Sequence, residues 1–368
     1  MGPMQLPLPL VAVAGTPAEC GAAYGAAVAA HIGSNLMAYR DRFASRAGLD
    51  LATVRRAGAG FRQTTRELAP RIAAMLDGVA EGSGAPVEEI YALNARTELL
   101  YGSAPCECTT LGVLDRYTES GHTILAQNWD WHPAQRPYTL LLATRDERGL
   151  AVVTLAEAGM LAKAGLSSSG LGVCINMLGC DRDGQPGGLP YHVLLRAVLE
   201  AGDLGRALQV ACESPRSASI NLLIGQAYAE WGGGEIIDVE LVPGDLGTLH
   251  PVDGLIAHAN HLETVLPVHD ALKDLGGSSF YRAARARRLL ALVAAERKVA
   301  QRDLAMILAD HASFPRAICR HVDLSDPEDE RSESIYSVLL DLDDRRMAVA
   351  AGPPCQGEYV WVKLDEIV

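Results

Sequence analysis

The hydrophobic positions in the first hundred residues recur at the spacing of helices. Thr16 is followed by a proline and, three residues after Thr16, by Glu19, which is the pattern of a capping box at the start of a helix. Asp50 is placed to cap a second helix, and Pro70 stands near the start of a third that glycines follow. The pattern predicts a helical layer, with helices over residues 17–43, 50–63, 67–79 and 87–100.

At Cys108 the pattern changes to short apolar and β-branched runs that are separated by turn signals. Such runs without helices between them indicate antiparallel strands. Two pairs of helical segments interrupt them, which predicts an α+β fold, a four-layer α/β/β/α sandwich of two antiparallel sheets covered by helices. The predicted strands cover 109–114, 122–129, 138–144, 151–155, 167–177, 218–230, 235–241, 248–258, 334–342, 347–351 and 358–364, and the helices 191–200, 203–213, 280–295 and 301–312.

The boundary near Cys108 is interpreted as a functional seam within one compact structural unit. The sequence contains no internal repeat and no linker long enough to separate two domains. Residues 1–107 form the N-terminal helical segment in this interpretation, and residues 108–368 form the layered core.

Composition and charge exclude several classes of function. The 368 residues carry a formal net charge of −13, which argues against a nucleic-acid partner because such partners require a basic face. No uninterrupted apolar stretch approaches the length of a membrane span. The first lysine or arginine is Arg40, so the N-terminus lacks the basic region of a signal peptide, and eight scattered cysteines fit reduced thiols. We therefore expect a cytoplasmic protein without a membrane or nucleic-acid partner.

Common cofactor and metal motifs are missing from the sequence. It has no phosphate-binding glycine loop, no dinucleotide fingerprint and no serine nucleophile elbow. Among the ten histidines, His258 and His261 come closest to metal-ligand spacing, and a zinc site that combines them with Cys106 and Cys108 remains an alternative. The two cysteines are too close in sequence for the usual redox or zinc pair. The sequence predicts no metal and no cofactor.

Cys108 becomes a candidate nucleophile only in combination with other segments. A lone cysteine at the start of a strand is more often a small core residue. Here five segments occur in a fixed order: Cys108-Thr109-Thr110, Gln127-Asn128-Trp129-Asp130-Trp131, Gly172-Val173-Cys174-Ile175-Asn176, His258-Ala259-Asn260-His261 and Ser278-Ser279-Phe280-Tyr281-Arg282. In this order they resemble the acyl-coenzyme A:6-aminopenicillanic-acid acyltransferase family of N-terminal-nucleophile (Ntn) hydrolases. That family is more distantly similar to bile salt hydrolases and acid ceramidase-type amidases.

The resemblance covers essentially the whole chain and implies roles for individual residues. Cys108 matches the family's nucleophile, which autoproteolysis between Glu107 and Cys108 releases from a zymogen as the N-terminus of a β chain. Asp130 matches the acid that holds the new α-amino group. Further implied residues are Asn176 and Asn260 at the oxyanion hole, Arg282 near the site, and Asn128, Trp131 and His261 as supporting or substrate-binding residues.

The implied chemistry follows from ordinary acid–base properties. A free thiol has a pKa of about 8.5 and needs a base, and an α-amine with a pKa of about 8 is suited to that work. An N-terminal cysteine carries both groups. Cys108 is then expected to form a thioester with a small amide or acyl thioester, while asparagine amides stabilise the oxyanion. Acyl-coenzyme A enters only as a substrate; water or an amine as acceptor, and homo-oligomerisation, stay open.

Each residue also has an ordinary structural explanation. Asp130 fits a turn residue, and Asn176 and Asn260 fit loop-fixing side chains. Trp129 and Trp131 share a strand, with one expected in the core and the other on a pocket wall. These explanations together describe the alternative function, an uncleaved, non-catalytic Ntn-fold protein that binds a ligand or a partner.

Glu107 departs from the family pattern, which often has glycine before the nucleophile. A carboxylate beside the scissile bond is able to assist or to slow the acyl shift. Cys106 lies two residues before Cys108, on the same side of an extended segment, but the two threonines that follow favour Cys108 as the nucleophile.

Overall fold

The computed structural model describes residues 6–100, 107–228, 232–274 and 277–368, and within them two β-sheets pack face to face. The eight-stranded sheet has the order β1-β4-β5-β6-β7-β8-β9-β10, and the six-stranded sheet the order β11-β2-β3-β12-β13-β14. The first consists of β1 (Leu10–Gly15), β4 (Thr139–Asp146), β5 (Ala151–Glu157), β6 (Gly165–Ser167), β7 (Leu171–Met177), β8 (Ile220–Ala227), β9 (Gly234–Val242) and β10 (Asp245–Leu249). The second consists of β11 (Leu255–His258), β2 (Glu107–Val113), β3 (Ile124–Trp131), β12 (Glu333–Asp341), β13 (Arg346–Ala351) and β14 (Val360–Lys363).

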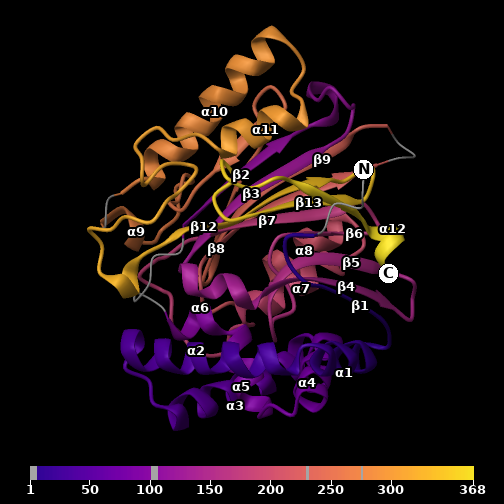
Figure 1. The fold of residues 1–368 in the computed structure, drawn as a ribbon, viewed down its shortest axis with the longest axis vertical. Helices are drawn as coiled ribbons and strands as arrows, with labels where there is room; N and C mark the ends of the chain where they lie inside the picture. The colour runs from indigo at the N-terminus through magenta and orange to yellow at the C-terminus, as the bar shows by residue number, and fades with distance from the viewer. Residues whose placement is uncertain (1–5, 101–106, 229–231, 275–276) are drawn as a thin grey trace.

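Helices cover both outer faces of this pair of sheets, as Figure 1 shows. The N-terminal half contributes α1 (Pro17–Ala27), α2 (Ala29–Ala47), α3 (Leu51–Leu68), α4 (Pro70–Ser83), α5 (Val87–Asn94) and α6 (Arg96–Leu99). The remainder contributes α7 (Tyr191–Leu199), α8 (Leu204–Glu213), α9 (Ala271–Asp274), α10 (Ser279–Glu296), α11 (Gln301–Leu308) and α12 (Leu364–Ile367). Among the described residues, no helix combines the length and the apolar character needed to cross a bilayer.

The hydrophobic cores confirm the predicted layers. Leu111 of β2 and Ile124 of β3 pack with Leu290 of α10 and Leu304 of α11, so these helices cover the six-stranded sheet. Strands β2 and β3 turn their other face to β7 and β8, while α7 and α8 contact the eight-stranded sheet from outside. Helices α1 to α5 lie at the opposite end of the molecule from α10 in Figure 1. The α+β sandwich with an added N-terminal helical part is therefore confirmed.

The N-terminal part is not entirely helical, contrary to the prediction. Leu10–Gly15 forms β1, which pairs in parallel with β4 at the edge of the eight-stranded sheet. The helical pattern begins only at Pro17, behind the Thr16 capping box, which the structure confirms. Because β1 precedes Cys108, the segment before the predicted cleavage site contributes one strand to the core. The division at 107 and 108 stays a prediction.

The predicted strand 248–258 is two strands that belong to different sheets. β10 ends at Leu249, and a turn at Asp253 (φ 50°) and Gly254 (φ 70°) leads into β11. A side chain at Gly254 would place its Cβ 2.1 Å from the Tyr117 ring, so both the backbone angle and the space require glycine. This crossover brings β11 beside β2 and delivers Asn260 to the start of β2.

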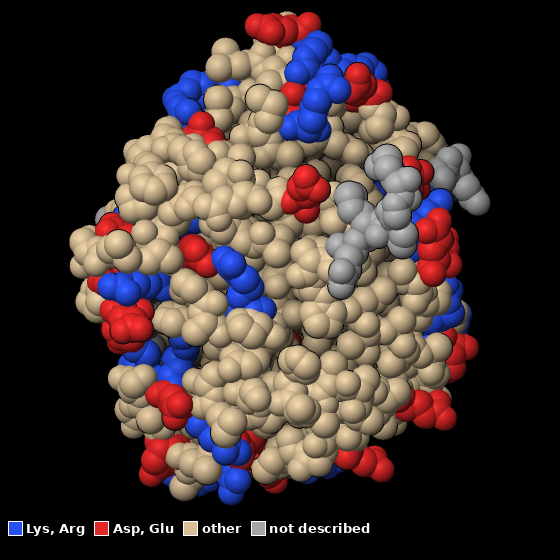
Figure 2. All heavy atoms as spheres, in the orientation of Figure 1, with Lys and Arg blue, Asp and Glu red and all other residues tan. Residues whose placement is uncertain are grey.

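Charged side chains of both signs share the surface. On the face drawn in Figure 2, basic side chains lie among acidic ones. Many of these are paired, as in Arg71 with Glu147 at 2.7 Å and Arg46 with Asp329 at 2.7 Å. Charges of both signs are therefore mixed on this face.

Candidate active site

Cys108 lies at the start of β2, where side chains replace a neighbouring strand. β11 begins its pairing with β2 at Thr110, opposite His258. At Cys108 the backbone N–H donates instead to Asn260 Oδ1 at 2.9 Å, and the carbonyl accepts from Arg282 Nη1 at 2.6 Å. The backbone around the predicted scissile bond is thus held by two side chains that the sequence had singled out.

Asn260 presents its side-chain oxygen to the Cys108 N–H. The Cys108 N–H and Arg282 Nη2 lie 2.9 Å each from Oδ1, and both groups are only able to donate. Asn260 Nδ2 donates to the Met177 carbonyl at 3.0 Å. In this arrangement Asn260 orients the Cys108 nitrogen, while the oxyanion-hole role expected of its amide stays a prediction.

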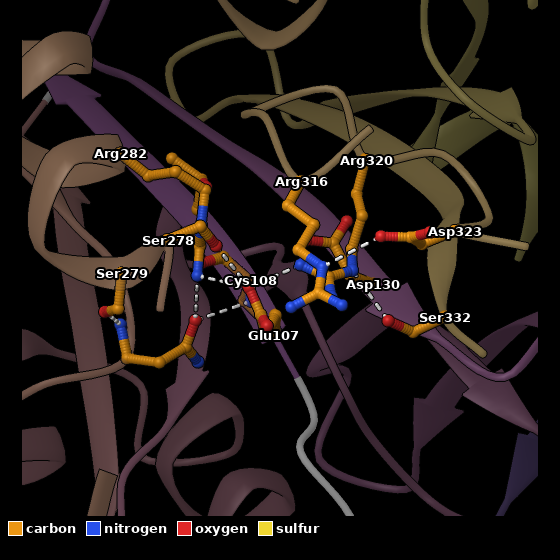
Figure 3. Close-up of polar contacts among 12 residues, drawn as sticks. Glu107, Cys108, Asp130, Ser278, Ser279, Arg282, Arg316, Arg320, Asp323 and Ser332 are labelled. Atoms are coloured by element: carbon orange, nitrogen blue, oxygen red, sulfur yellow. Dashed lines mark hydrogen bonds and ion pairs between the residues drawn. The ribbon is translucent and has the colours of Figure 1, made fainter. Parts of the chain in front are cut away.

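Arg282, in the first turn of α10, contacts Glu107, Cys108 and Asn260. Its side chain is fully buried, and Nη2 forms an ion pair with Glu107 Oε2 at 2.9 Å. Nη1 also donates to Thr109 Oγ1 at 2.8 Å, and Nε donates to Ser278 Oγ at 2.9 Å. Figure 3 shows Arg282 and Ser278 on one side of Cys108 and Glu107. Arg282 thus contacts both residues of the predicted cleavage site, and its role there stays a prediction.

Glu107 is accommodated by a second arginine that the sequence did not reveal. Arg320 Nη1 lies 2.8 Å from Glu107 Oε2, and the Ser278 hydroxyl donates to the same oxygen at 2.8 Å. Burial favours the neutral acid, but the charges of Arg282 and Arg320 outweigh it and lower the pKa of Glu107. Glu107 is therefore an ionised carboxylate between two guanidinium groups (Figure 3).

Asp130 lies directly opposite Glu107 in the register of β2 and β3. It is fully buried, and Ser334 Oγ donates to its Oδ1 at 2.6 Å. Burial raises the pKa of Asp130 to about 7, although the charge of Arg282 and the Ser334 hydrogen bond act in the opposite direction. Asp130 is thus the acidic side chain of the site that changes protonation near neutral pH.

Asn176 belongs to β7 of the opposite sheet and contacts β2 at Thr110. Its Oδ1 accepts from Thr110 Oγ1 at 2.9 Å and from Asn221 Nδ2 at 3.0 Å, and its Nδ2 points to the His258 carbonyl at 3.5 Å. Thr110 follows Cys108 by two residues and shares its face of the strand. Asn176 therefore reaches the candidate site through Thr110, and its predicted oxyanion role stays a prediction.

The three predicted supporting residues have different surroundings. Asn128 faces the outer helices, where its Nδ2 donates to the carbonyls of Leu308 and Ile318 at 2.8 Å each. These bonds hold β3 against the end of α11 and the segment after α11. His261 Nδ1 contacts the Ser279 hydroxyl at 2.8 Å, and that hydroxyl accepts from the Asn260 N–H at 2.7 Å. Burial lowers the pKa of His261, which favours the neutral ring.

Trp129 and Trp131 have different neighbours, in line with the expectation that one lies in the core and the other walls a pocket. Residues two apart share a strand face, and both tryptophans are buried. Trp131 packs against the Arg96 guanidinium, 4.3 Å from its ring centre. Trp129, the register partner of Cys108, is the one that lines a cavity.

This small cavity lies between the two sheets, next to Trp129, the register partner of Cys108. Lys163 Nζ stands 4.0 Å from the Trp129 ring centre and forms an ion pair with the buried Glu157 at 3.0 Å. Apolar side chains form most of the remaining wall. The lining residues are Gln127, Trp129, Leu155, Lys163, Ala164, Ile175, Tyr336 and Val338. Of these, only Gln127 and Trp129 belong to the block that contains Asp130, and Ile175 belongs to the block that ends at Asn176.

The zinc site considered around His258 and Cys108 is contradicted by the surroundings of His258. Its Nε2 contacts Glu240 Oε1 at 2.8 Å, and its Nδ1 contacts the Ala259 carbonyl at 2.9 Å, so both ring nitrogens are occupied. The carboxylates of Asp238 and Glu240 raise the pKa of His258 to about 9 against the effect of burial. A protonated imidazole is not a metal ligand. Cys106 lies outside the described residues.

The His258–Glu240 pair predicts a pH dependence of stability. Because the folded-state pKa of His258 lies above its unfolded value, the stabilisation is complete below about pH 6.5 and is lost as the pH rises to about 9. This corresponds to roughly 3 kcal/mol of unfolding free energy. Urea unfolding at a series of pH values measures it, and Glu240→Gln should remove most of the slope. Glu235→Gln, an exposed change on the same strand, is the control; an unchanged slope in Glu240→Gln contradicts the assignment.

Comparisons with known proteins agree with the sequence resemblance. The family model described as acyl-coenzyme A:6-aminopenicillanic acid acyl-transferase matches residues 117–356, well over half of the chain. The 40 kDa form of acyl-coenzyme A:6-aminopenicillanic-acid-acyltransferase from Emericella nidulans is 28% identical over 362 residues, which cover 95% of this chain and 94% of that protein.

Solved structures similar to the chain include the conjugated bile acid hydrolase of Clostridium perfringens, at 12% identity and a TM-score of 0.48, covering 70% of this chain and 93% of that one. Another is the penicillin V acylase of Agrobacterium tumefaciens, at 13% identity and a TM-score of 0.45, covering 70% of this chain and 87% of that one. From the match to the family model, the chain belongs to the acyl-coenzyme A:6-aminopenicillanic acid acyl-transferase family of enzymes.

Proposed function

We propose that this enzyme is a self-processing cysteine acyltransferase or amidase that uses Cys108 as an N-terminal nucleophile. The observation that carries the proposal is the set of side chains that bind the backbone at Cys108. Its N–H and its carbonyl are bound by Asn260 and Arg282, while the preceding carboxylate of Glu107 is neutralised by two arginines. A structural cysteine at a strand end does not require this set of buried charged and polar side chains.

The processing step is an N-to-S acyl shift followed by hydrolysis. Cys108 Sγ attacks the carbonyl carbon of Glu107, the C–N bond breaks, and the thiol proton moves to the departing Cys108 nitrogen. Water then cleaves the thioester, which leaves Glu107 as a new C-terminus and Cys108 with a free thiol and a free amine. Asn260 Oδ1 already contacts this nitrogen at 2.9 Å and is suited to hold the amine afterwards.

The freed amine supplies the base for turnover. It accepts the proton of the Cys108 thiol, and the thiolate attacks the substrate carbonyl to form a thioester. The amine returns the proton to the leaving group, and water or an amine then takes the acyl group. Because Asp130 is buried and has a pKa raised to about 7, its ionised form provides a nearby negative charge that favours a protonated amine during this step.

The cavity next to Trp129 has room for about one water molecule, so an acyl group has to displace its mostly apolar walls to enter. Leu155, Ile175 and Val338 supply apolar walls, and Trp129 places its ring next to the nucleophile's strand. The Emericella nidulans relative is named as an acyl-coenzyme A:6-aminopenicillanic-acid-acyltransferase, and for this chain we propose substrates of the class of small acyl thioesters and amides. The strand β1 would keep the two processed chains together within one sheet.

Intact mass measurement of the purified protein tests the proposal. We expect denaturing electrophoresis to separate two chains, of which the larger begins at Cys108. Incubation with acyl thioesters or amides should then add the acyl mass to that larger chain, and hydroxylamine should remove it because thioesters are labile to this reagent. An active protein that remains one chain would falsify the mechanism. An uncut, inactive protein that still binds the same compounds would support the binding-protein alternative.

A further inference from the structure

Two histidines and two cysteines meet at one point outside the candidate active site. The donor atoms of His311, Cys319, His321 and Cys355 all lie within 4.8 Å of one another. They come from three segments: the residues after α11, the loop before β12, and the loop after β13. Sequence spacing gives no sign of the cluster, because only Cys319 and His321 are close in the chain.

Hydrogen bonding alone does not account for the arrangement. The Nε2 atom of His321 lies 3.1 Å from His311 Nε2, 3.5 Å from Cys319 Sγ and 3.4 Å from Cys355 Sγ. One imidazole nitrogen takes part in one hydrogen bond, either as donor or as acceptor. Three neighbours converging on it instead have the geometry of ligands around a shared ion.

The distances match the edges of a tetrahedral zinc site. With Zn–N bonds of about 2.05 Å and Zn–S bonds of about 2.3 Å, a regular tetrahedron has N···N edges of about 3.3 Å and N···S edges of about 3.6 Å. The three distances at His321 Nε2 lie within about 0.2 Å of these values. Two thiolates and two imidazoles are also a common donor set for structural zinc.

We propose that His311, Cys319, His321 and Cys355 bind one structural zinc ion. Binding releases the two thiol protons, and the two thiolates and two neutral imidazoles bring the net charge of the Zn²⁺ site to zero. A neutral site adds no charge close to the arginines of the loop, so it is compatible with the ion pair between Arg320 and Glu107.

The proposed ion would hold the loop that carries Arg320. This arginine stands between the ligands Cys319 and His321 in the chain, and its Nε donates to Ser332 Oγ at 2.6 Å. Its backbone N–H also donates to Ser334 Oγ at 3.0 Å, and the Ser334 N–H donates to the Arg320 carbonyl at 3.0 Å. One ion would bind both residues that flank Arg320, Cys319 and His321, and also Cys355 in the β13–β14 connection. Arg320 is then held beside Glu107.

Metal analysis of the full-length protein tests this proposal independently of catalysis. The protein should be produced in zinc-supplemented medium without a polyhistidine tag and desalted before elemental analysis. We expect one zinc per chain, and at least a tenfold loss in Cys355→Ser and in His311→Gln, two changes at exposed side chains. The matched controls, Cys212→Ser at a half-buried cysteine and His250→Gln at an exposed histidine, should keep the full content.

Cobalt substitution gives a second readout that reports the ligands directly. Metal-free protein refilled with Co²⁺ should show the intense visible bands of a tetrahedral site and a thiolate-to-metal charge-transfer band, both lost in Cys355→Ser. The proposal is overturned if zinc is absent as purified and is not taken up on addition. It is equally overturned if Cys355→Ser and His311→Gln retain the metal, or if peptide mapping finds Cys319 and Cys355 joined as a disulfide.

Discussion

Cys108→Ala is expected to yield a single uncut chain of 368 residues without measurable acyl-enzyme formation. In the proposed mechanism the thiol is the attacking group both in the N-to-S shift and in turnover, so one change removes both reactions. The expected loss of turnover is on the order of 10⁴-fold or more, as for other nucleophile deletions. Intact mass measurement reports processing, and an assay of amide or thioester cleavage reports turnover.

Two other cysteines serve as matched controls. Cys174→Ala removes a buried thiol from β7 in the opposite sheet and should leave processing complete. Cys106→Ala separates the two neighbouring cysteines of the sequence and should likewise be cut before Cys108. Because Cys108 is buried, the alanine variant must also be shown to unfold cooperatively. Cleavage before residue 108 in Cys108→Ala, or normal turnover by it, contradicts the assignment of the nucleophile.

The sequence was informative where the candidate site residues lie within short contiguous segments. Cys108, Asp130 and Asn260 each sit in a short segment with recognisable neighbours, and the strand pattern located the segments on β2, on β3 and after β11. Periodicity fixes which residues share a strand face, but not which strand lies beside which. The crossover at Gly254, which places β11 next to β2, depends on a left-handed turn that hydrophobic patterning does not encode.

Features built from dispersed residues were not predictable from the sequence. Arg320 reaches Glu107 from a loop more than two hundred residues away, and nothing adjacent in sequence distinguishes it from a surface arginine. The cluster of His311, Cys319, His321 and Cys355 likewise exists only after three segments have folded together. Strand β1 is not distinguished by the sequence pattern, because its short apolar run directly precedes a strong helix start at Thr16.

The same limit applies within the basic run of α10. Arg282 and Arg285 are one turn apart in sequence, yet Arg282 is fully buried against β2 while Arg285 forms a partly exposed ion pair with Asp310. Only the orientation of the helix decides which guanidinium faces the strand. This difference makes Arg285 the natural control for a change at Arg282.

Arg282→Met is expected to have the second largest effect. Methionine fills similar space but leaves the partly buried Glu107 carboxylate with Arg320 alone, and losing the charged hydrogen-bond partner costs about 1–3 kcal/mol. The change also removes the donor to the Cys108 carbonyl. Stability should be measured by urea unfolding in the Cys108→Ala background, where every variant is uncut, and the rate of processing in the protein that retains Cys108.

Further variants separate the two contributions of Arg282. Arg282→Lys keeps the charge but cannot reproduce the forked contacts with Glu107, Thr109 and the Cys108 carbonyl, so it should retain more stability than processing. Glu107→Gln combined with Arg282→Met should not recover the lost stability, because the buried Arg320 then lacks its carboxylate partner, and it should still process slowly. Arg285→Met should affect both quantities much less, since solvent screens its ion pair. If Arg282→Met is processed at the unchanged rate, or destabilises no more than Arg285→Met, Arg282 does not organise the cleavage site.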